Sequence, residues 1–362
     1  MRGFAVAALA LLGLGFSLTP LAERADALLL DLQWSVLRKF DPRPAPDDII
    51  VVGIDEASRQ RIGAATGLWH EPLGEALVRL ASARPRAIGL DVPLPERSYD
   101  EIRPGMDRAL LTGLAAARQN GPLVASLSID ARSRSARPIH APFLAVLGEE
   151  GLGIGLIARD RDGVTRRFSV GIPTEDGAFP TLAGRLCRAI ARECGDGLIH
   201  FALGQPYRYV PLQQVLDSRD PVWLQKLFRD RIVLVGETRP YSDRIAVPAN
   251  LAGWESGRGD SPAVVVHAQS LRTALAGAAP AEASRPLVVL LVGAVALLAL
   301  ARDWRLAWVS AALAGALLVA GALWSLRSGL FVPVSAPLFT LLLAAAALTL
   351  GALSRRFVIR RR

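Results

Sequence analysis

Asp48-Ile-Ile-Val-Val-Gly-Ile-Asp55 is an apolar run bounded by an acid at each end. A continuous apolar run without polar alternation is typical of a strand buried on both faces of a parallel sheet. Similar runs follow it, and two segments between them, 70–83 and 104–119, have apolar residues at helical spacing. This alternation predicts an α/β fold with a mostly parallel sheet and right-handed crossovers. The further predicted strands are Arg86–Asp91, Pro122–Ile129 and Arg231–Gly236.

The rest of this domain is predicted to add a hairpin and two helices. The segments Gly153–Ala158 and Thr165–Ile172 flank Asp160-Arg-Asp162-Gly163, a turn sequence typical of a β-hairpin. Helical spacing predicts helices over Phe179–Cys194 and Val264–Ala276.

Cys187 and Cys194 are the two cysteines of the chain, and both fall in the first of these helices. Seven residues of α-helix rise by about 10 Å, whereas the Cα atoms of a disulfide lie within about 7 Å of each other. We therefore predict two unlinked core thiols, unless the helix ends before Cys194.

Apolar residues are concentrated at the two ends of the chain. They make up 51% of the sequence, which excludes a disordered protein and a simple cytosolic enzyme. Four uncharged runs predict four membrane spans, although the second is shorter than the roughly 20 residues that a span usually needs. The runs are Phe4–Ala22, Leu287–Ala301, Leu306–Leu326 and Leu330–Leu353. They divide the chain into one span (1–23), a large domain (24–286), three spans (287–353) and an Arg-rich tail (354–362).

Arginine residues flank the predicted spans unequally. Five follow the last span and Arg302 and Arg305 lie between the second and third, whereas Arg327 alone lies in the next short loop. Because cytoplasmic loops are enriched in Arg and Lys, both termini of this multi-pass protein are predicted to be cytoplasmic and residues 24–286 extracytoplasmic. A signal peptide cleaved near Ala25-Asp26-Ala27 is the alternative for the N-terminus, and it exports the same domain.

The net charge of +9 arises mostly from these flanking arginines. Residues 24–286 contain 33 basic and 31 acidic side chains, which nearly balance. A nucleic-acid-binding face needs a concentrated basic patch, so no nucleic-acid partner is expected.

Acidic residues end or follow three of the predicted strands. Asp55 and Asp91 end two of them, and Asp243 lies seven residues beyond Gly236. Ligands of open parallel sheets bind outside the carboxyl ends of the strands, so one interpretation is a shared ligand-binding site. His267, at the start of the last predicted helix, is a candidate hydrogen-bonding or pH-sensitive group near that edge. The alternative is structural, because an Asp at a strand end commonly caps the next turn and a histidine at a helix start can bond backbone alone.

The sequence contains no recognisable catalytic or cofactor motif. Its four histidines are isolated, and Gly-x-Ser-x-Gly does not occur. Asp160 and Asp162 lack the further acids of a calcium loop. The series Gly151-x-Gly153-x-Gly155 precedes a predicted strand, whereas a dinucleotide loop precedes a helix. We expect a protein that is not an enzyme and that carries no metal or cofactor.

The order of several short motifs resembles a known family. The series is similar to the type-two CHASE domain, an extracellular sensor found with bacterial adenylate cyclases, histidine kinases and diguanylate cyclases, and the likeness covers nearly the whole chain. Between the first span and the closing three, the motifs are Phe40-Asp-x-x-Pro44, Ile50-Val-Val-Gly-Ile-Asp-Glu56, Gly67-x-Trp69, Ala87-Ile-Gly-Leu-Asp91, Asp160-x-Asp-Gly-Val-x-Arg-Arg167, Arg231-Ile-Val-Leu-Val-Gly236, Asp243-x-x-x-x-Pro248 and Val265-Val-His-Ala268.

Two features depart from the family pattern. The family's Trp-Pro-Trp segment reads Leu68-Trp-His-Glu-Pro72 here, and the sequence stops nine residues after the last predicted span, where family members usually continue into a cytoplasmic output domain. The resemblance implies a sensor in a bacterial inner membrane, for an unidentified small-molecule or environmental stimulus. Its signal would pass through the spans to a separate cytoplasmic kinase or cyclase, unless the chain is a fragment. The alternative is a membrane-anchored binding or assembly protein without signalling, and either is compatible with a homo-oligomer.

Overall fold

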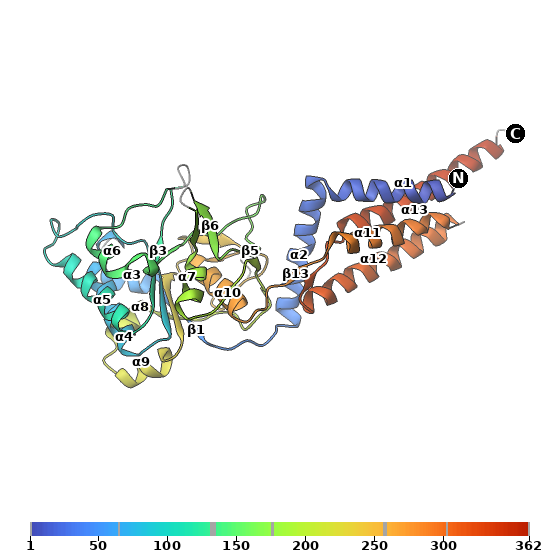
Figure 1. Cartoon of the computed structure of the whole chain (residues 1–362). Coiled ribbons are helices and arrows are strands. Elements are labelled where there is room, and N and C mark those ends of the chain that lie inside the picture. Colours follow the sequence, from blue (N-terminus) through green and yellow to red (C-terminus); the bar gives the residue numbers. More distant parts are fainter. Residues whose placement is uncertain are drawn as a thin grey trace. The chain divides into compact units, whose positions relative to one another are not determined.

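The computed structural model describes residues 2–63, 66–130, 135–174, 177–255, 259–301 and 303–360 (Figure 1). The chain forms two compact units. We call Arg38–Ala279 the α/β unit, and Met1–Leu37 together with Pro280–Arg362 the helical unit.

A six-stranded sheet forms the centre of the α/β unit, and all of its strand pairs are parallel. The strand order is β4-β3-β2-β10-β1-β9. The predicted parallel sheet is therefore confirmed, with two short strands added at its edges. The strands are β1 (Ile49–Ile54), β2 (Ala87–Asp91), β3 (Leu123–Leu127), β4 (Leu152–Ile154), β9 (Tyr209–Pro211) and β10 (Ile232–Glu237).

Helices cover both faces of the sheet, as the continuous apolar strands require. On one face, Val52, Leu90 and Val235 contribute to a core cluster with α4, α5, α6, α8 and α9. On the other face, a Cβ at Gly89 would contact Leu186 of α7, and one at Gly236 would contact Val264 of α10. The helices are α3 (Glu56–Ile62), α4 (His70–Ser82), α5 (Met106–Asn120), α6 (Ala141–Leu147), α7 (Leu182–Ala189), α8 (Leu212–Asp217), α9 (Pro221–Phe228) and α10 (Ala263–Leu275).

The hairpin predicted over residues 153–172 is wrong in its pairing. Its first segment is β4, which joins the central sheet beside β3 because Leu152–Ile154 is apolar and buried on both faces. Its second segment divides into two short strands with other partners. These are β5 (Arg167–Phe168), antiparallel to β8 (Gly197–Leu198), and β6 (Gly171–Thr174), which forms a hairpin with β7 (Gly177–Pro180). A further antiparallel pair is β11 (Arg244–Ala246) with β12 (Asp260–Pro262).

The predicted unlinked thiols are also wrong, because Cys187 and Cys194 form a disulfide. Helix α7 ends at Ala189, five residues earlier than the periodicity indicates, and Ala191 adopts a left-handed φ of 54°. The chain then turns back, with Arg192 N donating to Cys187 O (2.9 Å), and the two Cα atoms lie 6.2 Å apart. The sequence allowed a disulfide only if the helix ended before Cys194, and the helix does end before it.

Replacing both cysteines by serine is expected to lower the free energy of unfolding by about 2–3 kcal/mol, because the unfolded chain gains the freedom of an open loop. Denaturant unfolding of the full-length protein in detergent measures this loss. Treating the parent protein with a reductant should reproduce it, and equal stability of parent and double variant would contradict the prediction.

The helical unit packs four apolar segments side by side (Figure 1). Phe16 of α1 stacks on Phe339 of α13 at 4.2 Å and Leu9 packs with Ala344, so α1 and α13 run antiparallel. The unit consists of α1 (Arg2–Ser17), α2 (Pro20–Phe40, which continues past the unit's boundary), α11 (Arg285–Ala296), the 3-10 helix η3 (Leu297–Leu300), α12 (Trp304–Arg327), α13 (Ser335–Arg360) and the paired strands β13 (Ala281–Glu282) and β14 (Leu330–Phe331).

Of the four predicted spans, two are helices long and apolar enough to cross a membrane by themselves, α12 and the 335–353 part of α13. Helices α1 and α2 give a third only if they are taken as one broken span, since they bend by 76°. The predicted first run, Phe4–Ala22, is thus interrupted, because α2 starts anew at Pro20 and proline fits the first turn of a helix. Helix α11 is apolar but shorter, at 12 residues.

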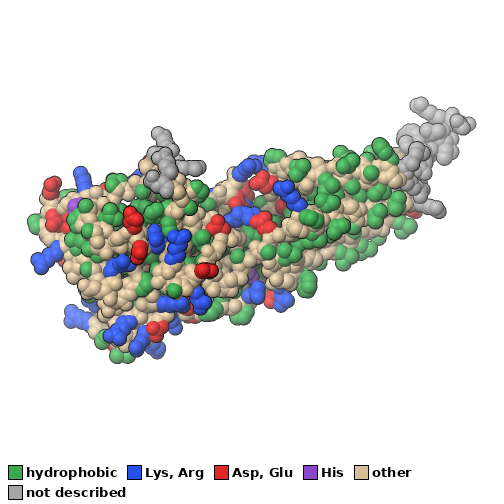
Figure 2. Space-filling model, in the orientation of Figure 1, with side chains coloured by type: hydrophobic (Ala, Val, Ile, Leu, Met, Phe, Trp, Pro, Cys, Tyr) green, Lys and Arg blue, Asp and Glu red, His purple; other side chains and the backbone are tan. Residues whose placement is uncertain are grey.

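Exposed apolar side chains cover the helical unit, as Figure 2 shows in green. Leu313 and Leu317 of α12 are 63% and 73% exposed, and Leu342 and Leu350 of α13 are also exposed. Apolar surface this extensive on long helices is typical of a membrane protein.

Candidate binding groove at the carboxyl edge of the sheet

Three neighbouring strands each lead into an acidic residue. Asp91 ends β2, Glu237 ends β10, and Asp55 follows β1 directly. Strand β10 lies between β2 and β1, with Gly236 paired to Asp91 and Glu237 paired to Ile54. The carboxyl ends of these parallel strands therefore bring three carboxylates to one edge of the sheet.

Asp91 is buried without a countercharge in contact with it. Its side chain is only 7% exposed, and Ser126 hydrogen-bonds it. Its Oδ2 atom has no hydrogen-bond partner in the described part of the chain. Burial raises the pKa of Asp91 to about 7, because the charged form loses its hydration. An uncompensated buried carboxyl is costly to a fold, so a group of this kind is a marker of a functional site.

His267 of α10 lies behind Asp91, with its Nε2 atom 3.8 Å from Asp91 Oδ1. The same ring nitrogen lies 3.2 Å from the carbonyl oxygen of Gly155, a contact in which it acts as the donor. Burial lowers the pKa of His267 to about 4, so the imidazole is neutral at pH 7. His267 therefore does not neutralise Asp91 at pH 7.

Asp243 supplies a second carboxyl from the loop after β10. Its φ of 50° is left-handed, a conformation that Asp tolerates better than most residues, and Ala263 N donates to its carbonyl at 2.9 Å. The pKa of Asp243 is raised to about 6, first by burial and then by the charge of Asp91. The charge of Asp91 thus influences the ionisation of Asp243.

A cavity of about 440 Å³ lies against these groups, and we call it the acidic groove. Glu237 lines it in a two-pronged ion pair with Arg239 (2.6 Å and 3.1 Å). Gly155 also lines the groove, and a Cβ there would overlap Ser126 Oγ. The groove is lined by Ile54, Asp91, Val92, Pro93, Ser126, Leu127, Ser128, Ile129, Gly155, Leu156, Glu237, Arg239, Ser242 and Asp243.

Asp55 does not face this groove and acts as the N-cap of α3. Its Oδ1 accepts hydrogen bonds from Ser58 N (2.8 Å) and Ser58 Oγ (2.6 Å), and its Oδ2 accepts one from Tyr209 (3.1 Å). It lines a neighbouring cavity of about 440 Å³, which shares Arg239 with the acidic groove. Of the four predicted site residues, the structure brings Asp91, Asp243 and His267 together, while Asp55 has the contacts of a cap.

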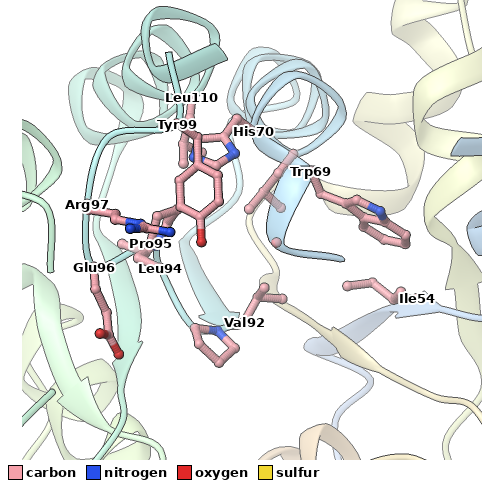
Figure 3. A pocket seen from close by; sticks show the side chains of 13 residues that line it. Ile54, Trp69, His70, Val92, Leu94, Pro95, Glu96, Arg97, Tyr99 and Leu110 are labelled. Carbon is pink, nitrogen blue, oxygen red and sulfur yellow. The ribbon is translucent and has the colours of Figure 1, made fainter. Parts of the chain in front are cut away.

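A further cavity of about 500 Å³ lies on the helix side of the edge and shares Ile54, Val92 and Pro93 with the acidic groove. Its other lining residues are mainly apolar and aromatic. Figure 3 shows the Tyr99 hydroxyl pointing into this cavity, with Arg97 beside the ring (5.9 Å to its centre). His70 lies in its wall, 3.5 Å from Asp107 of α5.

Sequence reasoning missed several of these residues. Glu237 ends β10 as Asp91 ends β2, so the rule that singled out Asp91 could have found it. Neither Ser126 nor Arg239 could have been singled out from the sequence, because a serine within an apolar strand and an arginine in a loop are common. Among the described residues, no group of three or more His, Cys, Asp or Glu side chains is placed to hold a metal ion.

Comparison with protein families identifies one match, to a CHASE2 domain, over residues 4–315. Neither the comparison with curated proteins nor that with solved structures gave a match. CHASE2 is an extracellular sensor domain of signalling proteins, which fits an α/β unit carried by apolar helices. Since the match covers most of the chain, this protein belongs to the CHASE2 domain family.

Proposed function

We propose that this protein is a membrane-bound sensor of a bacterial signal-transduction system, which binds a small-molecule stimulus in the acidic groove. The observation that carries the proposal is Asp91, a buried carboxyl with an unpartnered oxygen in a cavity at the carboxyl edge of the sheet. Proteins retain such a costly group where a ligand completes its interactions. The α/β unit acts by binding, and its signal passes through the helical unit to a separate cytoplasmic kinase or cyclase.

Two observations support an extracytoplasmic α/β unit. The Cys187–Cys194 disulfide fits an oxidising compartment. Arginine is enriched after Leu353 and between the second and third apolar segments, which favours a cytoplasmic side for those positions.

The packing of the helical unit supports four crossings. In α11, Leu287 near the start packs close to Val334, and Ala296 at the end packs with Ala344. Helix α12 runs back over the same depth, with Ala311 near Ala345 and Ala322 near Val334. With α1 antiparallel to α13, the four segments lie side by side over part of α13, and the start of α1 and the end of α13 lie at the same side.

Alkaline phosphatase, which is active only outside the cytoplasm, tests this topology. Fusions after Pro280 and Gly329 are expected to be active, and fusions after Arg305 and Arg362 inactive. If α11 does not cross, the fusions after Arg305 and Arg362 become active and the fusion after Gly329 becomes inactive. That pattern would contradict the four-span arrangement.

The proposed passage of the signal from the α/β unit to the helical unit, which we call the relay, can be tested without knowing the stimulus. A Phe16→Cys and Phe339→Cys pair reports the packing of α1 against α13, because the native cysteines are already linked to each other. In membranes, we expect Gly155→Ala and Asp91→Asn, which alter the acidic groove, to change the rate of oxidative crosslinking at least twofold.

The matched control is Asp230→Asn, which removes one charge from an exposed side chain with a left-handed φ of 59° that Asn also tolerates. It is expected to leave the crosslinking rate unchanged. Equal rates in all four backgrounds would favour a binding or assembly protein without signalling.

A further inference from the structure

We propose that the ligand of the acidic groove is an organic ammonium ion, bound through its charged nitrogen by Asp91 and Asp243. This inference rests on the proposed function and adds the chemical class of the stimulus.

The charges of the described residues around the groove leave a deficit of positive charge. Three carboxyls line it, and the arginine that lines it, Arg239, is bound through two hydrogen bonds to Glu237. Arg159 exerts a weaker influence on Asp243, and its guanidinium donates to the carbonyl of Arg244 (3.4 Å). Within the described residues, Asp91 and Asp243 are therefore left without a countercharge in contact.

The unpartnered oxygen of Asp91 indicates which carboxyl lacks a positively charged partner. Asp91 lines the groove, its side chain is more than nine-tenths buried, and its Oδ2 makes no hydrogen bond to the described residues. An ammonium group has three N–H donors and a positive charge, so it can pair with the carboxyl of Asp91 and with a second carboxyl together. His267 is held by Gly155 O and is not that donor.

The rest of the lining favours a cation that carries a carbon chain. A cavity of about 440 Å³ is much larger than a bare ion needs, and its walls include Val92, Leu127, Ile129 and Leu156. Ligand pockets of this type combine apolar walls with a few placed polar groups. An anion would be repelled by the carboxyls, and a neutral polyol would leave their charge uncompensated.

Isothermal titration of the full-length protein in detergent, at pH 8, tests the class directly. The probe is butylammonium chloride, its neutral match is 1-butanol, and magnesium and calcium chlorides are the inorganic alternatives. We expect butylammonium to bind at least tenfold more tightly than 1-butanol and than either metal ion. Asp91→Asn and Asp243→Asn are each expected to weaken its binding at least tenfold, while Asp230→Asn leaves it unchanged.

The outcomes separate this inference from the proposed function. Tighter binding of 1-butanol or of a metal ion, lost in Asp91→Asn, would overturn the ammonium class and leave the groove as the site. Butylammonium binding that both groove variants retain would place the amine elsewhere and overturn the inference. Absence of any binding by butylammonium at millimolar concentration would also overturn it, while the crosslinking test of the relay would stand. Using two groove variants keeps the test decisive if one of them fails to fold.

Discussion

Asp91→Asn is expected to stabilise the protein, and increasingly so as the pH rises. The unfolded Asp ionises near 3.8, whereas burial raises the folded pKa to about 7, so the parent loses stability as the pH rises from about 4 to about 7. At pH 8 the full difference is on the order of 4 kcal/mol, at 1.36 kcal/mol per pKa unit. Asparagine has the same shape and carries no charge, so it avoids this cost.

Denaturant unfolding of the parent and variant at pH 5 and pH 8 measures the effect. The stability gap is expected to widen by about 2–3 kcal/mol in favour of the variant between these pH values. His200 and His267 have lowered pKa values, about 4 in each case, and give the opposite slope, but they are present in both proteins. A gap that is independent of pH, or a variant that is less stable at pH 8, would contradict the account of Asp91 as a strained functional group.

Arg166→Met is expected to lower the free energy of unfolding by about 2 kcal/mol, because Asp160 and Asp162 lose the guanidinium that donates hydrogen bonds to both of them. Arg166 is 2% exposed. Its guanidinium donates to Asp160 (2.9 Å) and to both oxygens of Asp162 (2.9 Å and 2.7 Å). The hydrogen bonds from Arg166 lower the pKa of Asp162. The Asp-x-Asp-Gly-Val-x-Arg-Arg motif is thus a turn closed by a buried arginine.

The neighbouring Arg167 provides the control, since its side chain is exposed. Arg167→Met is expected to cost less than about 1 kcal/mol. Thermal unfolding of the two variants in detergent compares them, and equal losses would show that the motif does not depend on Arg166.

The central sheet could be predicted because its strands are buried on both faces. Ile49–Ile54 is apolar throughout, and Ile232–Glu237 is apolar up to its final residue, a pattern that few other elements share. The short strand β4 was misassigned because three apolar residues do not determine a partner. Helix α7 ends where the left-handed φ of Ala191 turns the chain, and periodicity does not register such a backbone conformation.

The candidate site could be predicted in part for a related reason. The carboxyl ends of parallel strands meet at one edge, so Asp91 and Asp243 could be expected to approach each other. Asp55 follows the same pattern and yet caps α3, because Ser58 lies three residues later and offers both of its donors. Whether a carboxyl at a strand end points into a cavity or back to its own helix depends on the next turn, which a strand pattern does not encode.

Affinity selection followed by mass spectrometry tests the central claim most directly, namely that the acidic groove binds a small molecule. The full-length protein in detergent is incubated with a small-molecule extract of bacterial cells and medium, recovered, and denatured to release what it holds. Our account predicts compounds enriched at least tenfold on the parent and on Asp230→Asn relative to Gly155→Ala, whose added Cβ would overlap Ser126 Oγ and displace this residue of the groove lining. Equal recovery of the same compounds from all three proteins, or no enrichment on any of them, would contradict it.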